Sequence, residues 1–151
     1  MISKKTKYAL KSLGILAEKG KNSAHPMLIA DLAAQESIPQ KFLEGILLTL
    51  KNRGILKSRM GKGGGYFLAR SPEEINIGEI VRTLEGPLAP FPCLSKTAYE
   101  RCEECKDELH CGIRLVFKDV HEATLQILEN TTLQDMVEKA RGTNQVTMYY
   151  I

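Results

Sequence analysis

Apolar residues recur at helical spacing in the first part of the chain, and turn-forming residues divide them into separate segments. Ser3 is a favourable N-cap for a first helix, and Gly20 is a suitable residue to end it. Pro26 suits the first turn of a second helix, which we predict over residues 27–35. This second helix is short.

A third helix follows after a short connection, residues 36–39. Ser37 and Gln40 have the spacing of a capping box, which predicts that the helix starts there, and Gly54 ends it. The residues predicted to face inward are Phe42, Leu43, Ile46, Leu47 and Leu50, and those predicted to face outward are Lys41, Glu44, Gly45, Leu48 and Asn52. Two helices joined by so short a turn are typical of a helix-turn-helix.

The pattern changes from helical to strand-like after the third helix. Residues 55–59 and 66–70 are strand-like runs on either side of the glycine-rich segment 60–65. This arrangement predicts a β-hairpin with a flexible basic tip, a wing. A fourth helix is predicted from near Gly78 to Gly86.

A long irregular segment and two further helices complete the chain. Residues 87–112 contain three prolines and no sustained period, which predicts a loop, and loops of this length are usually functional. Thr132 and Asp135 predict a capping box for the last helix. The predicted fold is mainly α with a small β-hairpin wing: a winged helix-turn-helix domain over 1–86, the loop over 87–112, a long helix and a short C-terminal helix over 113–141, and a tail over 142–151.

Charge is distributed unevenly along the chain. Residues 1–70 carry 13 Lys/Arg and 4 Asp/Glu, a net charge of +9, whereas residues 71–151 carry 8 and 14, a net charge of −6. The first part is therefore expected to bind a polyanion, although a solvated basic surface would have the same composition. The chain has no apolar run long enough for a membrane span, so we expect a soluble, cytoplasmic protein without a membrane partner.

A basic helix-turn-helix with a wing has a direct use in binding double-stranded DNA. Lys and Arg neutralise phosphates, and side chains at the start of the third helix reach base edges, where a glutamate accepts from the cytosine amino group. Gly45 costs helix stability and needs a reason, such as close approach to DNA. The candidate DNA-binding residues are Lys4, Lys5, Gln40, Lys41, Glu44, Arg59, Lys62, Gly63 and Gly64. The alternative is a merely solvated outer face.

The four cysteines, Cys93, Cys102, Cys105 and Cys111, lie within nineteen residues of one another. Without a secretion signal, such clustering indicates metal or redox chemistry, and the two-residue spacing between Cys102 and Cys105 suits one metal centre. Four thiolates satisfy an iron–sulfur cluster or tetrahedral zinc, while a metal-free thiol switch and inert cysteines are the alternatives. His110 is a reserve ligand, and His25 and His121 are expected to be surface or helix residues.

Several segments together resemble one known family. They are residues 1–10, MISKKTKYAL, the helix of residues 38–54, the wing segment GGGYFL at 63–68, INIGEI at 75–80 with Glu85 and Gly86, and the stretch from Cys111 through 131–133, TTL, to Met136. In these segments the chain resembles the IscR/NsrR/CymR regulators, the Rrf-two superfamily. The resemblance covers nearly the whole chain.

The resemblance implies a homodimer in which the helix of residues 113–129 crosses its twin, so that two recognition helices read a pseudo-palindromic operator. The broad apolar stripe of that helix agrees with a dimer, and ordinary packing within one chain is the alternative. In several family members three cysteines and a fourth ligand hold an iron–sulfur cluster.

This chain departs from the family's ligand pattern. The interval from Cys93 to Cys105 is longer than usual, Cys102 is an additional thiol, and Lys7 and Tyr8 stand where some members have an acidic ligand. Arg114 occupies the position of the histidine ligand. Cys102 is therefore the candidate fourth ligand.

Together these features predict a sequence-specific, DNA-binding transcription regulator whose DNA affinity is controlled by a cysteine-ligated iron–sulfur cluster or another metal. The alternative is a metal-free regulator that responds to thiol oxidation or to a partner protein. An enzyme is the least favoured class, because the sequence has no recognisable arrangement of a catalytic thiol with a histidine base.

Overall fold

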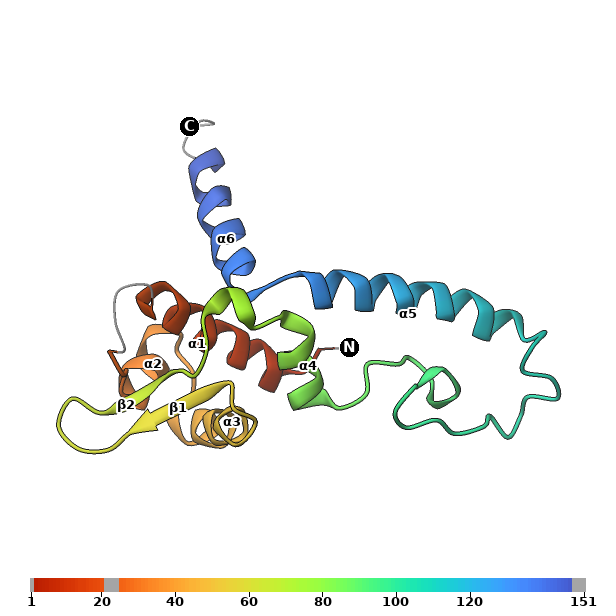
Figure 1. Cartoon of the computed structure of the whole chain (residues 1–151), viewed down its shortest axis with the longest axis horizontal. Coiled ribbons are helices and arrows are strands. Elements are labelled where there is room, and N and C mark those ends of the chain that lie inside the picture. The colour runs from red at the N-terminus through yellow and green to blue at the C-terminus, as the bar shows by residue number, and fades with distance from the viewer. Residues whose placement is uncertain (1, 21–24, 148–151) are drawn as a thin grey trace.

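The computed structural model describes residues 2–20 and 25–147. Helices α1 to α4 and a two-stranded hairpin form one compact body, α5 extends away from it, and α6 leaves it in a different direction (Figure 1). The elements are α1 (Lys4–Gly20), α2 (Ile29–Gln35), α3 (Gln40–Asn52), β1 (Leu56–Arg59), β2 (Gly65–Leu68), the 3-10 turn η1 (Pro72–Glu74), α4 (Ile77–Glu85), the 3-10 turn η2 (Pro92–Leu94), α5 (Gly112–Asn130) and α6 (Leu133–Thr147). The mainly α fold with a hairpin wing is confirmed.

The first helix begins as predicted. The Thr6 backbone N–H donates to Ser3 Oγ over 3.3 Å, which is the expected N-cap interaction. The predicted start of α2 at residue 27 is wrong by two residues, because Met27 is extended and exchanges two backbone hydrogen bonds with Tyr66, of 2.9 and 2.8 Å. A long-range contact with β2 therefore overrides the local helical signal.

The predicted capping box at the start of α3 is also wrong. Ser37 adopts a left-handed backbone conformation with φ of 52°, and Pro39 occupies the N-cap position without any side-chain cap. A proline disfavours helical geometry at the residue before it, so the helix cannot start before Pro39. It begins at Gln40 instead.

The inner face of α3 builds much of the hydrophobic core. Leu43, Ile46, Leu47 and Leu50 are fully buried, as predicted, together with apolar side chains of α1, α2, β1 and α4. The predicted inward position of Phe42 is wrong, since 47% of this residue is exposed. It lies at the edge of the buried face, where its ring contacts the Tyr8 ring edge-on with centroids 5.9 Å apart.

The predicted wing is an antiparallel hairpin in which Leu56 pairs with Leu68 and Arg59 with Gly65. The strands are shorter than expected, because β1 starts at Leu56 and β2 ends at Leu68. Gly65 has φ of 135°, and a Cβ there would clash with the Met27 carbonyl, so only glycine permits the contact between β2 and the segment before α2.

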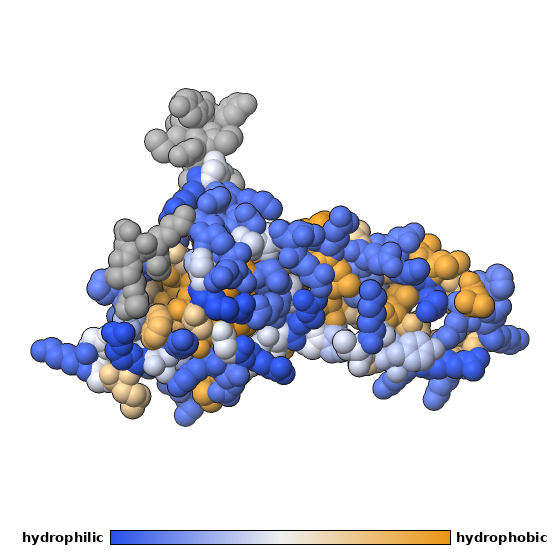
Figure 2. All heavy atoms as spheres, viewed as in Figure 1, coloured by the Kyte–Doolittle hydropathy of each residue, from blue (hydrophilic) through white to orange (hydrophobic). Residues whose placement is uncertain are grey.

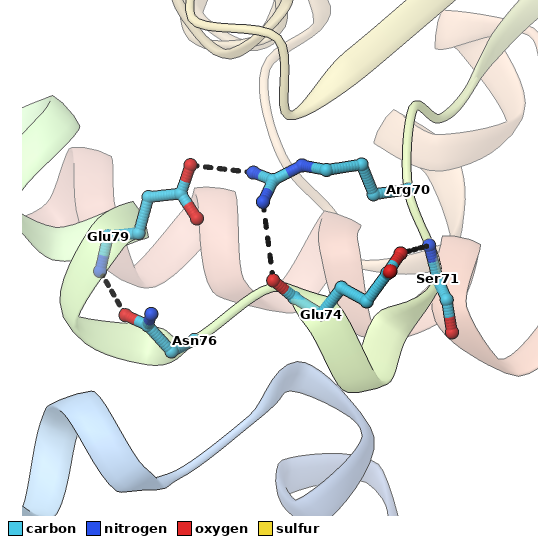
Figure 3. A network of polar contacts seen from close by, with 5 residues as sticks. All are labelled: Arg70, Ser71, Glu74, Asn76 and Glu79. Carbon is cyan, nitrogen blue, oxygen red and sulfur yellow. Dashed lines mark hydrogen bonds and ion pairs between the residues drawn. The ribbon is translucent and has the colours of Figure 1, made fainter.

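A polar network connects the end of the wing to α4 (Figure 3). The Arg70 guanidinium donates to the Glu74 carbonyl over 3.2 Å and to Glu79 Oε1 over 2.6 Å. Asn76 caps α4 by accepting from the Glu79 N–H over 2.7 Å. The network joins the residues that follow β2 to the start of α4.

The corner between α5 and α6 is bonded to the first residue of α4 and to the segment just before it. The Ile77 N–H donates to the Thr131 carbonyl, and the Leu133 N–H donates to the Ile75 carbonyl, both over 2.8 Å. The predicted capping box of Thr132 and Asp135 is confirmed, because each backbone N–H donates to the side chain of the other residue.

The last helix is longer than predicted. It continues to Thr147, beyond the expected end near residue 141, and residues 148–151 of the expected tail lie outside the described residues. Within the described ranges, the chain has no helix that is both long and apolar enough to span a membrane.

Glu85, at the end of α4, also caps the start of α1. Its Oε1 accepts from the Ser3 N–H over 2.8 Å and from the Thr6 hydroxyl over 2.5 Å. The hydrogen bonds from Ser3 and Thr6 lower the Glu85 pKa from 4.5 to about 2. The carboxylate therefore joins two helices that are distant in sequence.

We predict that Glu85→Gln lowers the thermal unfolding temperature at pH 7, because a neutral amide oxygen accepts these hydrogen bonds more weakly than the carboxylate does. The Glu85 pKa is depressed in the folded state, so its contribution is present above pH 4.5 and is lost as the pH falls towards 2. Thermal unfolding of both proteins across this range should show the difference shrinking with falling pH. A difference independent of pH would contradict the assigned role.

Candidate DNA-binding and cysteine sites

The exposed side of α3 carries the predicted base-contacting residues. Gln40, Lys41 and Glu44 are all exposed, because they lie away from the leucines that anchor α3 in the core. Gly45 lies on this exposed side too, and a Cβ at its position would meet nothing within 4 Å. Packing within the chain therefore gives no reason for a glycine at this position.

The wing presents a second set of candidates. Arg59, Lys62 and Gly63 are exposed, and the Arg59 guanidinium lies 5.9 Å from the centre of the Phe67 ring. Gly64 is buried, and a Cβ there would clash with the Arg59 carbonyl, so this glycine has a structural reason independent of any ligand. Its predicted contact with DNA stays a prediction.

The cationic candidates are available for an external anion. Among residues 2–20 and 25–147, no ion pair with an acidic side chain involves Lys4, Lys5, Lys41, Arg59 or Lys62. Other cations are paired within the chain, and these pairs are Lys11–Glu36, Arg70–Glu79, Arg82–Glu129, Lys118–Glu122 and Arg141–Glu18. Lys5 is half-buried, whereas the other four unpaired cations are exposed.

All four cysteines line one cavity of about 460 Å³ beside the start of α5. Cys93 belongs to η2, and Cys111 is the N-cap residue of α5. Cys102 is exposed, whereas the other three are half-buried, and all four are free thiols. The wall also contains Phe91, Pro92, Glu100, Arg101, Glu104, Glu108, Ile113 and Arg114.

Two contacts hold η2 against α5. The rings of Phe91 and Phe117 meet edge-to-face with centroids 5.0 Å apart, and the Arg114 Nε donates to the Cys93 carbonyl over 3.4 Å. These contacts of Arg114 and Phe91 were not predicted from the sequence, in which Arg114 was noted only at the position of the histidine ligand. An aromatic residue two positions before a clustered cysteine was the available signal.

The pKa of the Cys105 thiol is shifted by its surroundings in the cavity wall. Burial, followed by a hydrogen bond with the Cys111 side chain, raises the Cys105 pKa. This shift favours the neutral thiol, which is the less nucleophilic form. His110 does not line the cavity, and its Nδ1 lies 2.5 Å from Asp107 Oδ2, an interaction that lowers the Asp107 pKa.

The cysteine cavity meets some of the requirements of a metal centre. Four thiols on one cavity wall match an iron–sulfur cluster or zinc in ligand type and number. In the part of the chain that the structure describes, no three His, Cys, Asp or Glu side chains are close enough together to hold a metal ion. The cysteines thus share a cavity, and binding would require the loop to bring their sulfurs together.

The helix that carries Cys111 has a large apolar surface. Along α5, only His121 is buried, and apolar side chains gather over this helix on the face seen in Figure 2. Its exposed apolar residues are Ile113, Leu115, Val116, Phe117, Val120 and Ile127. Most of them follow helical spacing and form one stripe.

Comparison with known proteins identifies one family. Residues 2–139 match the model of the Rrf2 family, described as iron-dependent transcriptional regulators. A putative HTH-type transcriptional regulator, rrf2-like, from Rhodobacter capsulatus is 43% identical over 138 residues, which are 91% of this chain and 92% of that protein.

Two relatives with solved structures agree with this match. The CymR regulator of Bacillus subtilis is 33% identical over 150 residues, which are 99% of each chain. The structure of CymR, described as the global cysteine regulator of that organism, aligns with a TM-score of 0.76 and 30% identity over 92% of this chain and 97% of its own. The IscR structure of T. potens aligns with a TM-score of 0.74 and 26% identity over 99% and 96% of the two chains.

Proposed function

This chain belongs to the Rrf2 family of transcriptional regulators, whose named relatives are not enzymes, and from that premise we propose that it is a homodimer that binds operator DNA under the control of its four cysteines. One observation carries the proposal. The cysteine cavity lies at the start of α5, and the end of α5 is hydrogen-bonded to the segment before α4 of the DNA-binding domain. A change at the cysteines therefore has a physical connection to the winged helix.

The DNA contacts divide into two kinds. The unpaired cations Lys4, Lys5, Lys41, Arg59 and Lys62 neutralise phosphates of the two strands. Gln40 and Glu44, at the start of α3, reach base edges in the major groove. Gly45 allows the helix to approach the bases closely, which accounts for a glycine that packing does not require.

The stripe on α5 forms the dimer interface. Its apolar side chains are exposed in the single chain, and a contiguous row of exposed large apolar residues is typical of an interaction site. Crossing of two α5 helices would bury the stripe of each protomer against that of the other, as a two-fold interface requires. Two recognition helices would then read a pseudo-palindromic operator.

The four thiols support an iron–sulfur cluster as the controlling group. Cys93, Cys105 and Cys111, with Cys102 as the fourth ligand, would hold it as thiolates, and the family description of iron dependence agrees with this assignment. A bound cluster would supply one-electron redox chemistry and ligand exchange at iron. The residues of this chain do the coupling: Cys111 begins α5, while Cys93 rests on α5 through the Arg114 hydrogen bond.

A metal-free thiol switch is the second candidate. The observation in its favour is that Cys105 and Cys111 line the same cavity and that the Cys111 side chain contributes to the raised pKa of Cys105. Oxidation by a peroxide would join the two sulfurs and release two protons and two electrons to the oxidant, as disulfide formation requires. The raised pKa of Cys105 slows this reaction at neutral pH.

We predict different effects for two DNA-facing substitutions. Lys62→Ala should weaken binding to all sequences about equally and reduce the slope of log affinity against log salt by about 1, because one phosphate contact is lost. Glu44→Ala should relax the preference at one base position by about 1–3 kcal/mol. Affinities for a panel of single-base operator variants at several salt concentrations measure both effects. Uniform loss across the panel for Glu44→Ala would remove its role in base readout.

We predict that the double substitution Phe117→Asp and Val120→Asp gives monomers with weak operator binding, because two charges cannot be buried in the α5 interface. Sedimentation velocity measures the oligomeric state. Gln126→Asp, an exposed position of α5 off the stripe, is the matched control and should remain dimeric. An unchanged dimer in the double variant would locate the interface elsewhere.

We predict that single Cys→Ser changes at positions 93, 102, 105 and 111 reduce the iron content and visible absorbance of anaerobically purified protein. Lys96→Ser, in the same loop and off the cavity wall, is the control and should keep both. Operator affinity of loaded and metal-free protein, at one salt concentration, should differ by about 1–3 kcal/mol, a typical allosteric coupling. Equal affinity would reject the cluster as the controlling group, and a full centre in Cys102→Ser would remove Cys102 from the ligands.

A further inference from the structure

The solvent side of α3 has a regular composition along one line, which we call the outer stripe. Its members are Lys41, Gly45, Leu48 and Asn52, at spacings of four, three and four residues, so they lie on one face, opposite the buried leucines. Lys41 and Asn52 are polar, as expected on an exposed helix face, and Gly45 has no side chain. Leu48 is the exception.

Leu48 is exposed without an internal reason. It is 52% exposed, and it is not among the side chains packed against the core. The other exposed large apolar residue of α3, Phe42, has a partner in Tyr8. A leucine at the centre of the stripe therefore offers its methyl groups to a ligand outside the chain.

Gly45 makes the position of Leu48 more favourable for a close contact. Side chains on a helix lean towards its N-terminus, so Leu48 lies over the turn that contains Gly45. A Cβ at Gly45 would meet nothing within 4 Å, and the glycine leaves that turn without a side chain. The Leu48 side chain is therefore not screened by a neighbour at position 45.

Resting on the proposed DNA binding, we infer that Leu48 is a specificity-determining residue that recognises thymine by contact with its 5-methyl group. In the major groove, the thymine methyl is the apolar feature among base-edge donors and acceptors, and an apolar side chain is its complementary partner. Leu48 lies one helical turn after Glu44, which the proposed function turns to the bases, and this position favours DNA over a protein partner. Glu44 and Leu48 would then read different base pairs.

The test compares thymine with deoxyuracil, which lacks only the 5-methyl group. Full-length protein is first used to select its operator from random duplex DNA, and each thymine of that operator is then replaced singly by deoxyuracil. For the wild-type protein, one replacement in each half-site should weaken binding by about 3- to 5-fold, the value of one buried methyl group. For Leu48→Ala, the same replacement should have no effect.

Two comparisons make the result decisive. Leu28→Ala removes an equally exposed leucine of the helix-turn-helix outside α3, and it should keep the full thymine-to-uracil difference. Thermal unfolding of Leu48→Ala should match the wild type, because alanine is a good helix former at an exposed site. The role of Leu48 is overturned if no thymine-to-deoxyuracil replacement changes the affinity of the wild type, or if the replacements weaken the wild type and Leu48→Ala equally. Either result leaves operator binding itself intact. Failure to select any operator would instead overturn the proposed function itself.

Discussion

The pair of backbone hydrogen bonds between Ile75, Ile77, Thr131 and Leu133 determines how the rest of the molecule is arranged. Each bond contributes about 0.5–1.5 kcal/mol net, and full burial of Ile75 and Leu133 adds about 1.5–3 kcal/mol for each side chain. Because this corner is anchored, α5 is held at its C-terminal end and extends away from the compact body (Figure 1). Its apolar stripe therefore stays uncovered, and the cysteine loop is carried to the far end of the helix.

The same anchorage connects the cysteine loop to the proposed DNA-binding surface by two routes. One runs along α5 to the corner before α4. The other enters α4 directly at its C-terminal end, where Glu85 is bonded to the start of α1, while Glu79 near the N-terminal end receives Arg70 from the wing. A shift of α4 would therefore also displace the start of α1 and the end of the wing. Helix α4 is therefore suited to the proposed coupling, because the cysteine site and the DNA-binding site would both act on its position.

Glycines in the proposed DNA-binding region occur for two different reasons. At Gly64 and Gly65 the backbone passes so close to another backbone segment that a side chain would clash, which explains the wing's shape without reference to DNA. At Gly45 there is open space, and the helix loses stability for no internal gain. The contrast distinguishes glycines that packing requires from Gly45, for which the proposed function supplies the reason, close approach to DNA. The outer stripe of α3 is therefore central to the proposed recognition.

Local patterns in the sequence were sufficient for most helices, the hairpin and the Thr132–Asp135 capping box, because helical period, turn residues and caps act between near neighbours. They were not sufficient where a residue contacts a distant segment. Met27 pairs with Tyr66, so α2 begins two residues later than predicted. Phe42 contacts Tyr8 at the edge of the core and is not buried. The clustering of four cysteines was visible in the sequence, but their common cavity depends on η2 resting against α5. Only the tertiary structure decided this, since contacts between residues far apart in the chain leave no periodic signal.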